Sequence, residues 1–567
     1  MDTNTLKKSF RIDHLDFGTA RLVLFGLVNF FLTFFLSKYI LNTDDFLNHA
    51  IAHQITKGQH LYTSITLLLP PLNFYLIAAL RLLPTDPEFT YRVCVGIISA
   101  TSAVLLQLIL RNTSGRHLGD ALAFFTLFGH FLLIPTIWYG NNAALCVLVG
   151  LYFLSKPSLS ISDNIWASIA FMMAVFFKQN IGIPAVLVLF LFGWIDGIKL
   201  ASLRIFVAGL TAISILTALT LLSGTSFANY LAIFWEHNFT LIQEASTRSL
   251  TVKHVFVNVL GGWVDFSSDY YKHFLPAYAL GIALLALSMH LSTRVANSIF
   301  VGVWLVAVLL ATCFIVLTRL HSHHAFFNVI FVSILCLIAV LVARQIESRS
   351  FSRKIVLPLL IGAASMTGAL LKGPWGIVEV YNLIFASIGL LLGASARLNY
   401  KALTYLFSAV FLQVSVYNFA VFFRDFKSID WEKFQQVDVP GISGFRFYNN
   451  ARTYQGLSQA NQWLENNGAD KSFFVFPPEV PLHLVRNDID KTGVINTSKN
   501  IFPHPMATTI IAIERADPDV ILWKLDHTQV EATSFFTDKE KETMFKFVSS
   551  RYNLVDQIQN YRIYTRK

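Results

Sequence analysis

Apolar runs of about 17–22 residues alternate with short charged segments along the first three quarters of the chain, and a helix needs about 20 residues to cross the hydrocarbon of a bilayer. The runs therefore predict about thirteen membrane-spanning helices. They lie near residues 22–40, 93–110, 121–137, 143–154, 165–177, 181–195, 205–222, 274–289, 296–317, 325–342, 355–371, 380–392 and 402–423.

After residue 423 the chain becomes polar, with short apolar strings at 473–476, 520–522 and 561–564. Helix-like stretches at 454–465 and 539–548 alternate with these strings, and polar turns separate them. The pattern predicts a polytopic α-helical membrane domain over residues 1–423 and a separate α/β domain over 424–567.

Composition agrees with membrane insertion, because 54% of the 567 residues are hydrophobic and 14% are charged. Soluble domains carry about 25% charged residues. The net charge of +10 lies largely between the apolar runs, where it orients helices, so nucleic acid is not a predicted partner. The four cysteines fall within apolar runs and do not form a disulfide or zinc pattern. The first apolar run is too long for a cleavable signal peptide.

Lysine and arginine set the predicted orientation. With a cytoplasmic N-terminus, the inner segments hold many basic residues and the short outer turns at most one each, which is the positive-inside pattern. The inner basic residues are Arg111, Arg116, Lys156, Lys199, Arg204, Arg294, Arg344, Arg349, Arg353, Lys354, Arg397 and Lys401. The long loops 42–90 and 224–272 and the C-terminal domain are then extracytoplasmic. Within the first loop, Pro70-Pro71 and Arg81 predict a short interfacial helix rather than a further span.

An acidic pair, Asp44 and Asp45, stands where the first predicted span leaves the membrane. A carboxylate there could act as general base and take a proton from an attacking hydroxyl group. Acidic residues are equally typical of a helix start, where Thr43 or Asp44 would cap the helix and Asp45 would favour its positive end. The sequence leaves both interpretations open.

Two histidines, His49 and His53, follow Asp45 at intervals of four residues, so all three share one helical face. Such a face could bind a divalent metal, although a plain polar face at the headgroup level is more common. No metal or other cofactor is therefore predicted.

Lys178 interrupts an apolar stretch at a predicted outer turn, and Arg319, His323 and His324 form another. Cations at such turns could bind the phosphate of a membrane lipid. The alternatives are a lysine that extends into water and an ordinary polar loop. Weaker candidates for an acceptor cleft lie in the long outer loops; these are His49, Tyr62, Glu236 and His237.

In this order and on this side of the membrane, these residues resemble the GT-C integral-membrane glycosyltransferases, in the branch of protein O-mannosyltransferases and lipid A aminoarabinose transferases. In that branch the first outer loop begins with an acidic pair, then has an interfacial helix, a Gly-x-x-Tyr-like turn and a Pro-Pro helix. Asp44-Asp45, 58–62 and Pro70-Pro71 occupy those places. The resemblance covers roughly residues 20–345. One departure is Asn141-Asn142, where many members carry a second acidic residue.

The resemblance implies that Asp44 is the catalytic base, with Asp45 in place of the usual glutamate. It implies that Lys178, Arg319, His323 and His324 bind the donor phosphate. The donor would be a polyprenyl-phosphate sugar and the acceptor a hydroxyl group of an envelope lipid, glycan or protein. The expected location is the inner (plasma) membrane. Two other functions remain open: a transporter or flippase of a lipid-linked sugar, and a non-catalytic scaffold for envelope assembly.

Overall fold

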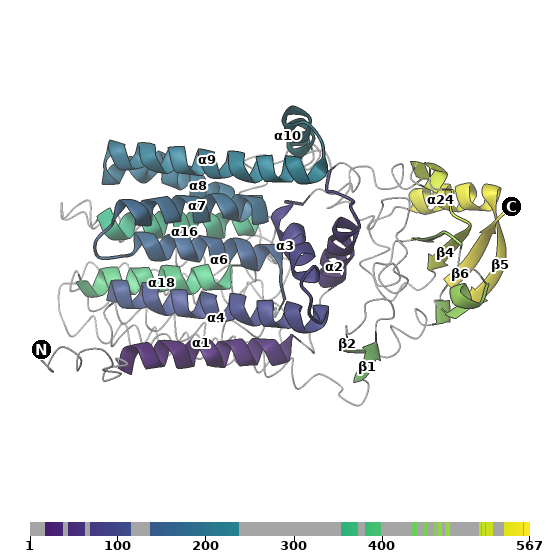
Figure 1. The fold of residues 1–567 in the computed structure, drawn as a ribbon, viewed down its shortest axis with the longest axis horizontal. Helices are drawn as coiled ribbons and strands as arrows, with labels where there is room; N and C mark the ends of the chain where they lie inside the picture. The colour runs from purple at the N-terminus through teal and green to yellow at the C-terminus, as the bar shows by residue number, and fades with distance from the viewer. Residues whose placement is uncertain are drawn as a thin grey trace, which may run out of the picture.

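The computed structural model describes residues 17–37, 43–62, 69–114, 136–236, 353–371, 380–397, 434–438, 446–450, 459–460, 462–467, 471–476, 510–511, 513–515, 517–524, 538–558 and 561–567. Within these ranges, long apolar helices lie side by side in a bundle (Figure 1). They are α1 (Phe17–Leu36), α4 (Pro87–Ser114), α6 (Tyr139–Leu154), α7 (Ile161–Phe177), α8 (Gln179–Phe192), α9 (Ile198–Ser223), α16 (Arg353–Leu371) and α18 (Tyr381–Arg397).

Each of these helices coincides with a predicted apolar run. Three of them are long and apolar enough to cross a membrane, at Thr19–Leu36, Pro87–Thr113 and Ile198–Ser223, and the other apolar helices described are shorter. This architecture fits a membrane protein. The predicted runs at 274–289, 296–317, 325–342 and 402–423, and all but the last two residues of the run at 121–137, lie outside the described residues, so the number of thirteen spans stays a prediction.

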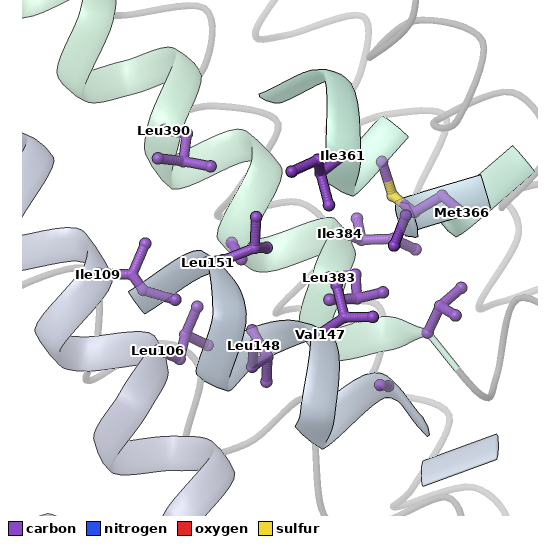
Figure 2. Packing of buried hydrophobic residues seen from close by; sticks show 14 of the residues in the cluster. Leu106, Ile109, Val147, Leu148, Leu151, Ile361, Met366, Leu383, Ile384 and Leu390 are labelled. Atoms are coloured by element: carbon purple, nitrogen blue, oxygen red, sulfur yellow. The ribbon is translucent and has the colours of Figure 1, made fainter. Parts of the chain in front are cut away.

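The centre of the bundle is a layer of aliphatic side chains from four helices. Figure 2 shows Leu106 and Ile109 of α4 beside α6, and α16 and α18 facing them. Because lipid tails are as apolar as leucine, close packing rather than exclusion from water holds such helices together, and small residues permit it. Gly389 of α18 is one such residue, since a Cβ atom there would overlap the side chain of Leu110.

Three short helices lie across one end of the bundle, the end at which α1 finishes and α4 begins (Figure 1). They are α2 (Thr43–Thr56), α3 (Leu72–Arg81) and α10 (Phe227–Trp235). The helix predicted after Pro70-Pro71 is α3, whose 10 residues span about 15 Å, half of the hydrocarbon thickness. Ile51, Leu61 and Phe74 are fully buried where α2, α3 and their connection pack together.

The C-terminal part of the chain contains a sheet of order β3-β4-β6-β5. Strand β3 (Phe473–Phe476) is parallel to β4 (Val520–Lys524), whereas β6 (Tyr561–Arg566) is antiparallel to both β4 and β5 (Tyr552–Ile558). Helix α24 (Asp538–Arg551) packs Met544 and Val548 against one face of the sheet. A separate antiparallel pair joins β1 (Phe434–Asp438) to β2 (Arg446–Asn450).

The three apolar strings of the tail are thus β3, β4 and β6. The sheet lies beyond the bundle end that carries α2 and α3, and α1 begins at the opposite end (Figure 1). The domain boundary at residue 423 and the side of the membrane on which the sheet lies stay predictions.

Candidate functional site at one end of the bundle

Lys178 forms a one-residue turn between two antiparallel helices. Its backbone is extended, with φ −159° and ψ 112°, so that α7 ends at Phe177 and α8 begins at Gln179. The Lys178 N–H donates to the Ala174 carbonyl at 2.8 Å, and the Lys178 carbonyl accepts from the Gly182 N–H at 3.0 Å. Gly182 makes the turn possible, because any Cβ atom there would overlap the backbone of Ala174 and Val175.

The Lys178 side chain is buried, with 4% of its surface exposed. Its Nζ lies 4.6 Å from the centroid of the Tyr139 ring and 5.7 Å from that of the Trp138 ring. An ammonium group over an aromatic face is stabilised by about 2 kcal/mol when water is excluded. The lysine therefore does not extend into water, and its charge is held inside the protein.

The two rings beside Lys178 are held in place by a hydrogen-bonded clamp at the start of α6. Asn73 of α3 donates to the Ile137 carbonyl at 3.4 Å and accepts from the Asn142 side chain at 2.7 Å. The Ile137 N–H donates to the Tyr91 hydroxyl of α4 at 3.0 Å. Asn142, at the place where the resemblance expects a second acidic residue, thus joins α6 to α3.

Asp44 and Asp45 lie in the first turn of α2, at the same end of the bundle. Their helical backbone agrees with a capping role and with a catalytic one. The positions of their side chains lie outside the described part of the structure, so the choice between these roles stays open.

His49 and His53 share one face of α2, as predicted from their spacing. The His49 ring is buried 4.5 Å from the Tyr91 ring. Burial, with a smaller contribution from the charge of Arg81, lowers the pKa of His49 to about 3, so this ring is neutral at pH 7. His53 Nδ1 lies 3.2 Å from Arg81 Nη2. The histidine face therefore lies beside an arginine. In the part of the chain that is described, no group of three His, Cys, Asp or Glu side chains could hold a metal ion.

The remaining predicted residues are spread over several places. Tyr62 is buried with a left-handed backbone, φ 71°, and its hydroxyl donates to the Leu69 carbonyl at 2.6 Å. Its ring lies 5.8 Å from that of Phe234. Glu236 is exposed at the end of α10. Four predicted site residues lie outside the described residues: His237, Arg319, His323 and His324.

Several buried polar atoms at this end have no hydrogen-bond partner within the described contacts: Trp138 Nε1, Tyr230 Oη and Asn48 Nδ2. Native proteins pair most buried polar groups, so unpaired ones call for an explanation.

The sequence offered one signal for part of this site, namely the aromatic pair Trp138-Tyr139 directly before Asn141-Asn142. It offered none for Asn73 or Tyr91.

The chain has structural similarity to solved proteins, at low sequence identity. Among solved structures, it is similar to ArnT from Cupriavidus metallidurans bound to undecaprenyl phosphate, with 13% identity, a TM-score of 0.43, and coverage of 96% of this chain and 97% of that chain. It is also similar to the Archaeoglobus fulgidus oligosaccharyltransferase tethered with an acceptor peptide. That match has 12% identity, a TM-score of 0.48, and coverage of 98% of this chain and 74% of that chain.

No protein-family model matches the chain, and no curated protein sequence matches it. With identities of 12% and 13% and TM-scores below 0.5, the structural similarities carry no argument about individual residues or substrates.

Proposed function

We propose that this protein is a glycosyltransferase that moves a sugar from a polyprenyl-phosphate donor to a hydroxyl group of an envelope lipid, glycan or protein. The observation that carries the proposal is the buried ammonium group of Lys178, fixed over the Tyr139 and Trp138 rings at the bundle end that holds α2. A cation held in a dry site interacts more strongly with an anion than the same cation in water.

The proposed reaction is a single inverting displacement. The acceptor oxygen attacks the anomeric carbon of the sugar, and the bond between that carbon and the phosphate oxygen breaks. The phosphate leaves with the bonding electrons, and the Asp44 carboxylate takes the proton of the acceptor hydroxyl. Asp45 is the second carboxylate of the pair. The mechanism uses no cofactor.

Lys178 contributes through the charge of the leaving group. The phosphate gains negative charge as the glycosidic bond breaks, so a fixed cation stabilises the transition state more than the ground state. We assign Arg319, His323 and His324 to the same phosphate. His49, Tyr62, Glu236 and His237 are proposed for the acceptor side. Among these, Tyr62 has its hydroxyl engaged with Leu69 and Glu236 is exposed to an incoming molecule.

The proposed location is the inner (plasma) membrane, with a cytoplasmic N-terminus, about thirteen spans and an extracytoplasmic α/β domain at 424–567. The helix directions support this orientation. Arg111, Lys199 and Arg204 belong to the ends of α4 and α9 that lie away from α2, as the positive-inside pattern expects of a cytoplasmic end.

The test is transfer by the purified full chain in liposomes, with synthetic polyprenyl-phosphate hexoses and pentoses as donors. Asp44→Asn should reduce turnover by about 10²–10⁴-fold, the usual contribution of a general base. Its matched control is Asp86→Asn, because Asp86 is an exposed acid beside the start of α4 that accepts from the Glu88 N–H. Turnover that survives both Asp44→Asn and Asp45→Asn would contradict the catalytic assignment.

Lys178→Gln should weaken donor binding by about tenfold or more, since a charge-assisted hydrogen bond contributes about 1.5–3 kcal/mol. Lys178→Arg should retain part of that affinity, and Lys199→Gln, an exposed lysine near the other end of the bundle, should leave it unchanged. Equal donor affinity in Lys178→Gln and the parent protein would remove the phosphate role of Lys178.

A further inference from the structure

Arg81 is a second cation at this end of the bundle, and it is not part of the proposed catalytic site. It is the last residue of α3, and its Nη2 lies 3.2 Å from Nδ1 of His53 on α2. The arginine donates in this contact, so the histidine accepts with a neutral ring. Burial lowers the pKa of the Arg81 guanidinium below its usual value.

The charge of Arg81 has no counter-charge among its described contacts. Nη1 is buried without a hydrogen-bond partner in the described part of the protein, and the contact of Nη2 is with an imidazole. Arg92, one turn into α4, differs in this respect, because it forms an ion pair with Glu88. A partly desolvated guanidinium without an acid is costly, and an anion that binds beside it reduces that cost.

The residues that follow Arg81 indicate the kind of anion. Leu82 and Leu83 are 71% and 48% exposed, and Phe89 at the start of α4 is 55% exposed. An exposed apolar strip next to a cation at the end of a transmembrane bundle suits the membrane interface, where acyl chains meet charged headgroups. A free phosphate would use the cation and leave the leucines in water.

We propose that Arg81 and His53 form a binding site for the headgroup phosphate of an anionic phospholipid, with Leu82 and Leu83 against its acyl chains. The site assigns a role to His53, which the proposed function does not use. It stands apart from Lys178, which contacts Trp138 and Tyr139 instead. The lipid fixes the α2–α3 pair at the membrane surface.

The test uses the purified full chain in detergent, titrated with short-chain phosphatidylglycerol, short-chain phosphatidylcholine or inorganic phosphate. Bound lipid is counted by native mass spectrometry, and thermal stability is followed in parallel. Phosphatidylglycerol should bind and raise the midpoint of unfolding. Phosphatidylcholine should bind more weakly and raise the midpoint less, and inorganic phosphate should neither bind nor raise it. Stabilisation by inorganic phosphate alone, or equal stabilisation by both lipids, would overturn the proposal.

Single substitutions test whether the binding of phosphatidylglycerol depends on Arg81. Arg81→Gln should weaken phosphatidylglycerol binding by about tenfold or more, the loss expected for a charge-assisted hydrogen bond. Arg92→Gln and Lys178→Gln should retain the parent affinity, which separates this site from a paired arginine and from the donor site. The proposed site would be wrong if Arg81→Gln bound phosphatidylglycerol with the parent affinity, or if Arg92→Gln lost as much affinity as Arg81→Gln.

A second variant serves if Arg81→Gln does not fold. Leu82→Gln with Leu83→Gln changes only exposed side chains and keeps the cation, and it should weaken phosphatidylglycerol binding several-fold. Unchanged binding in this double variant would overturn the acyl-chain contact and, with it, the phospholipid as occupant.

Discussion

The two ends of the bundle each bury a cation, and they hold it in different ways. Arg204 of α9 is fully buried; its Nε donates to the Asn164 side chain of α7 at 2.8 Å and its Nη1 donates to the Gly193 carbonyl at 3.1 Å. Lys178, at the other end of α7, lies over the faces of Trp138 and Tyr139. Along α7, Asn164 and Lys178 are about 20 Å apart at 1.5 Å per residue.

This difference separates a structural charge from one suited to binding. The hydrogen bonds of Arg204 tie three consecutive elements, α7, the end of α8 and α9, into one unit. Nearby, Asp163 bonds to Lys156 and to Ser160, so the polar groups around it are also paired. At the Lys178 end, buried atoms such as Trp138 Nε1 and Tyr230 Oη lack hydrogen-bond partners among the described contacts. A bound ligand can supply such partners, whereas the described polar groups around Arg204 are already paired.

The largest effect on stability is expected from Asn164→Leu, at the end of the bundle that holds Arg204. The substitution leaves the buried Arg204 guanidinium without one acceptor, which should cost about 2–3 kcal/mol of the free energy of unfolding. Transfer activity per folded molecule should stay at the parent value, because the donor site lies at the other end. The two measurements are denaturant unfolding in micelles and liposome transfer assays.

The matched control for that prediction is Asn180→Leu. Asn180 donates to the Gly368 carbonyl at 3.2 Å, a bond between neutral groups, so its loss should cost only about 1 kcal/mol. If the two leucine variants are equally destabilised, Arg204 does not depend on Asn164 and the contrast between the two ends fails.

Gly182→Ala should have the next largest effect, and it acts at the end that holds Lys178. The new methyl group would overlap the backbone of Ala174 and Val175, and backbone cannot move aside as a flexible side chain can. Separating α7 from α8 should cost about 1–3 kcal/mol, as overpacking usually does. It should also raise the donor concentration for half-maximal transfer, because the turn positions Lys178.

Gly209→Ala is its control. Position 209 is also helical, but no atom lies within 4 Å of a Cβ atom there. Alanine should therefore stabilise α9 by about 0.5–1 kcal/mol through its helix propensity and leave donor affinity unchanged. A Gly182→Ala protein with unaltered donor affinity would show that the tight turn does not position the lysine.

The sequence predicts the helices better than the site. Apolar runs locate α1, α4, α6 and α9 because a helix in lipid must be apolar over a fixed length. Lys178 could be singled out because a charge inside an apolar stretch is costly. The clamp that holds the rings beside it could not be predicted, since Asn73 and Asn142 are 69 residues apart and their contact depends on how α3 packs. The charge pattern predicts Arg204 in an inner segment between helices, whereas Arg204 lies inside α9 and is fully buried.

The prediction with the smallest effect at neutral pH is a pH dependence of stability that comes from His49. Its pKa is 6.5 in the unfolded chain and about 3 in the folded protein, so between these values the unfolded chain binds a proton that the folded protein does not. Stability should thus fall as pH drops below 6.5, by up to about 1.4 kcal/mol per pH unit, with no contribution from His49 above it. His49→Leu should remove that part of the slope in unfolding measured between pH 6.5 and 4.5. Equal slopes in the two proteins would mean that His49 is not held neutral against Tyr91 and Arg81, and the packing of α2 on α3 and α4 would need revision.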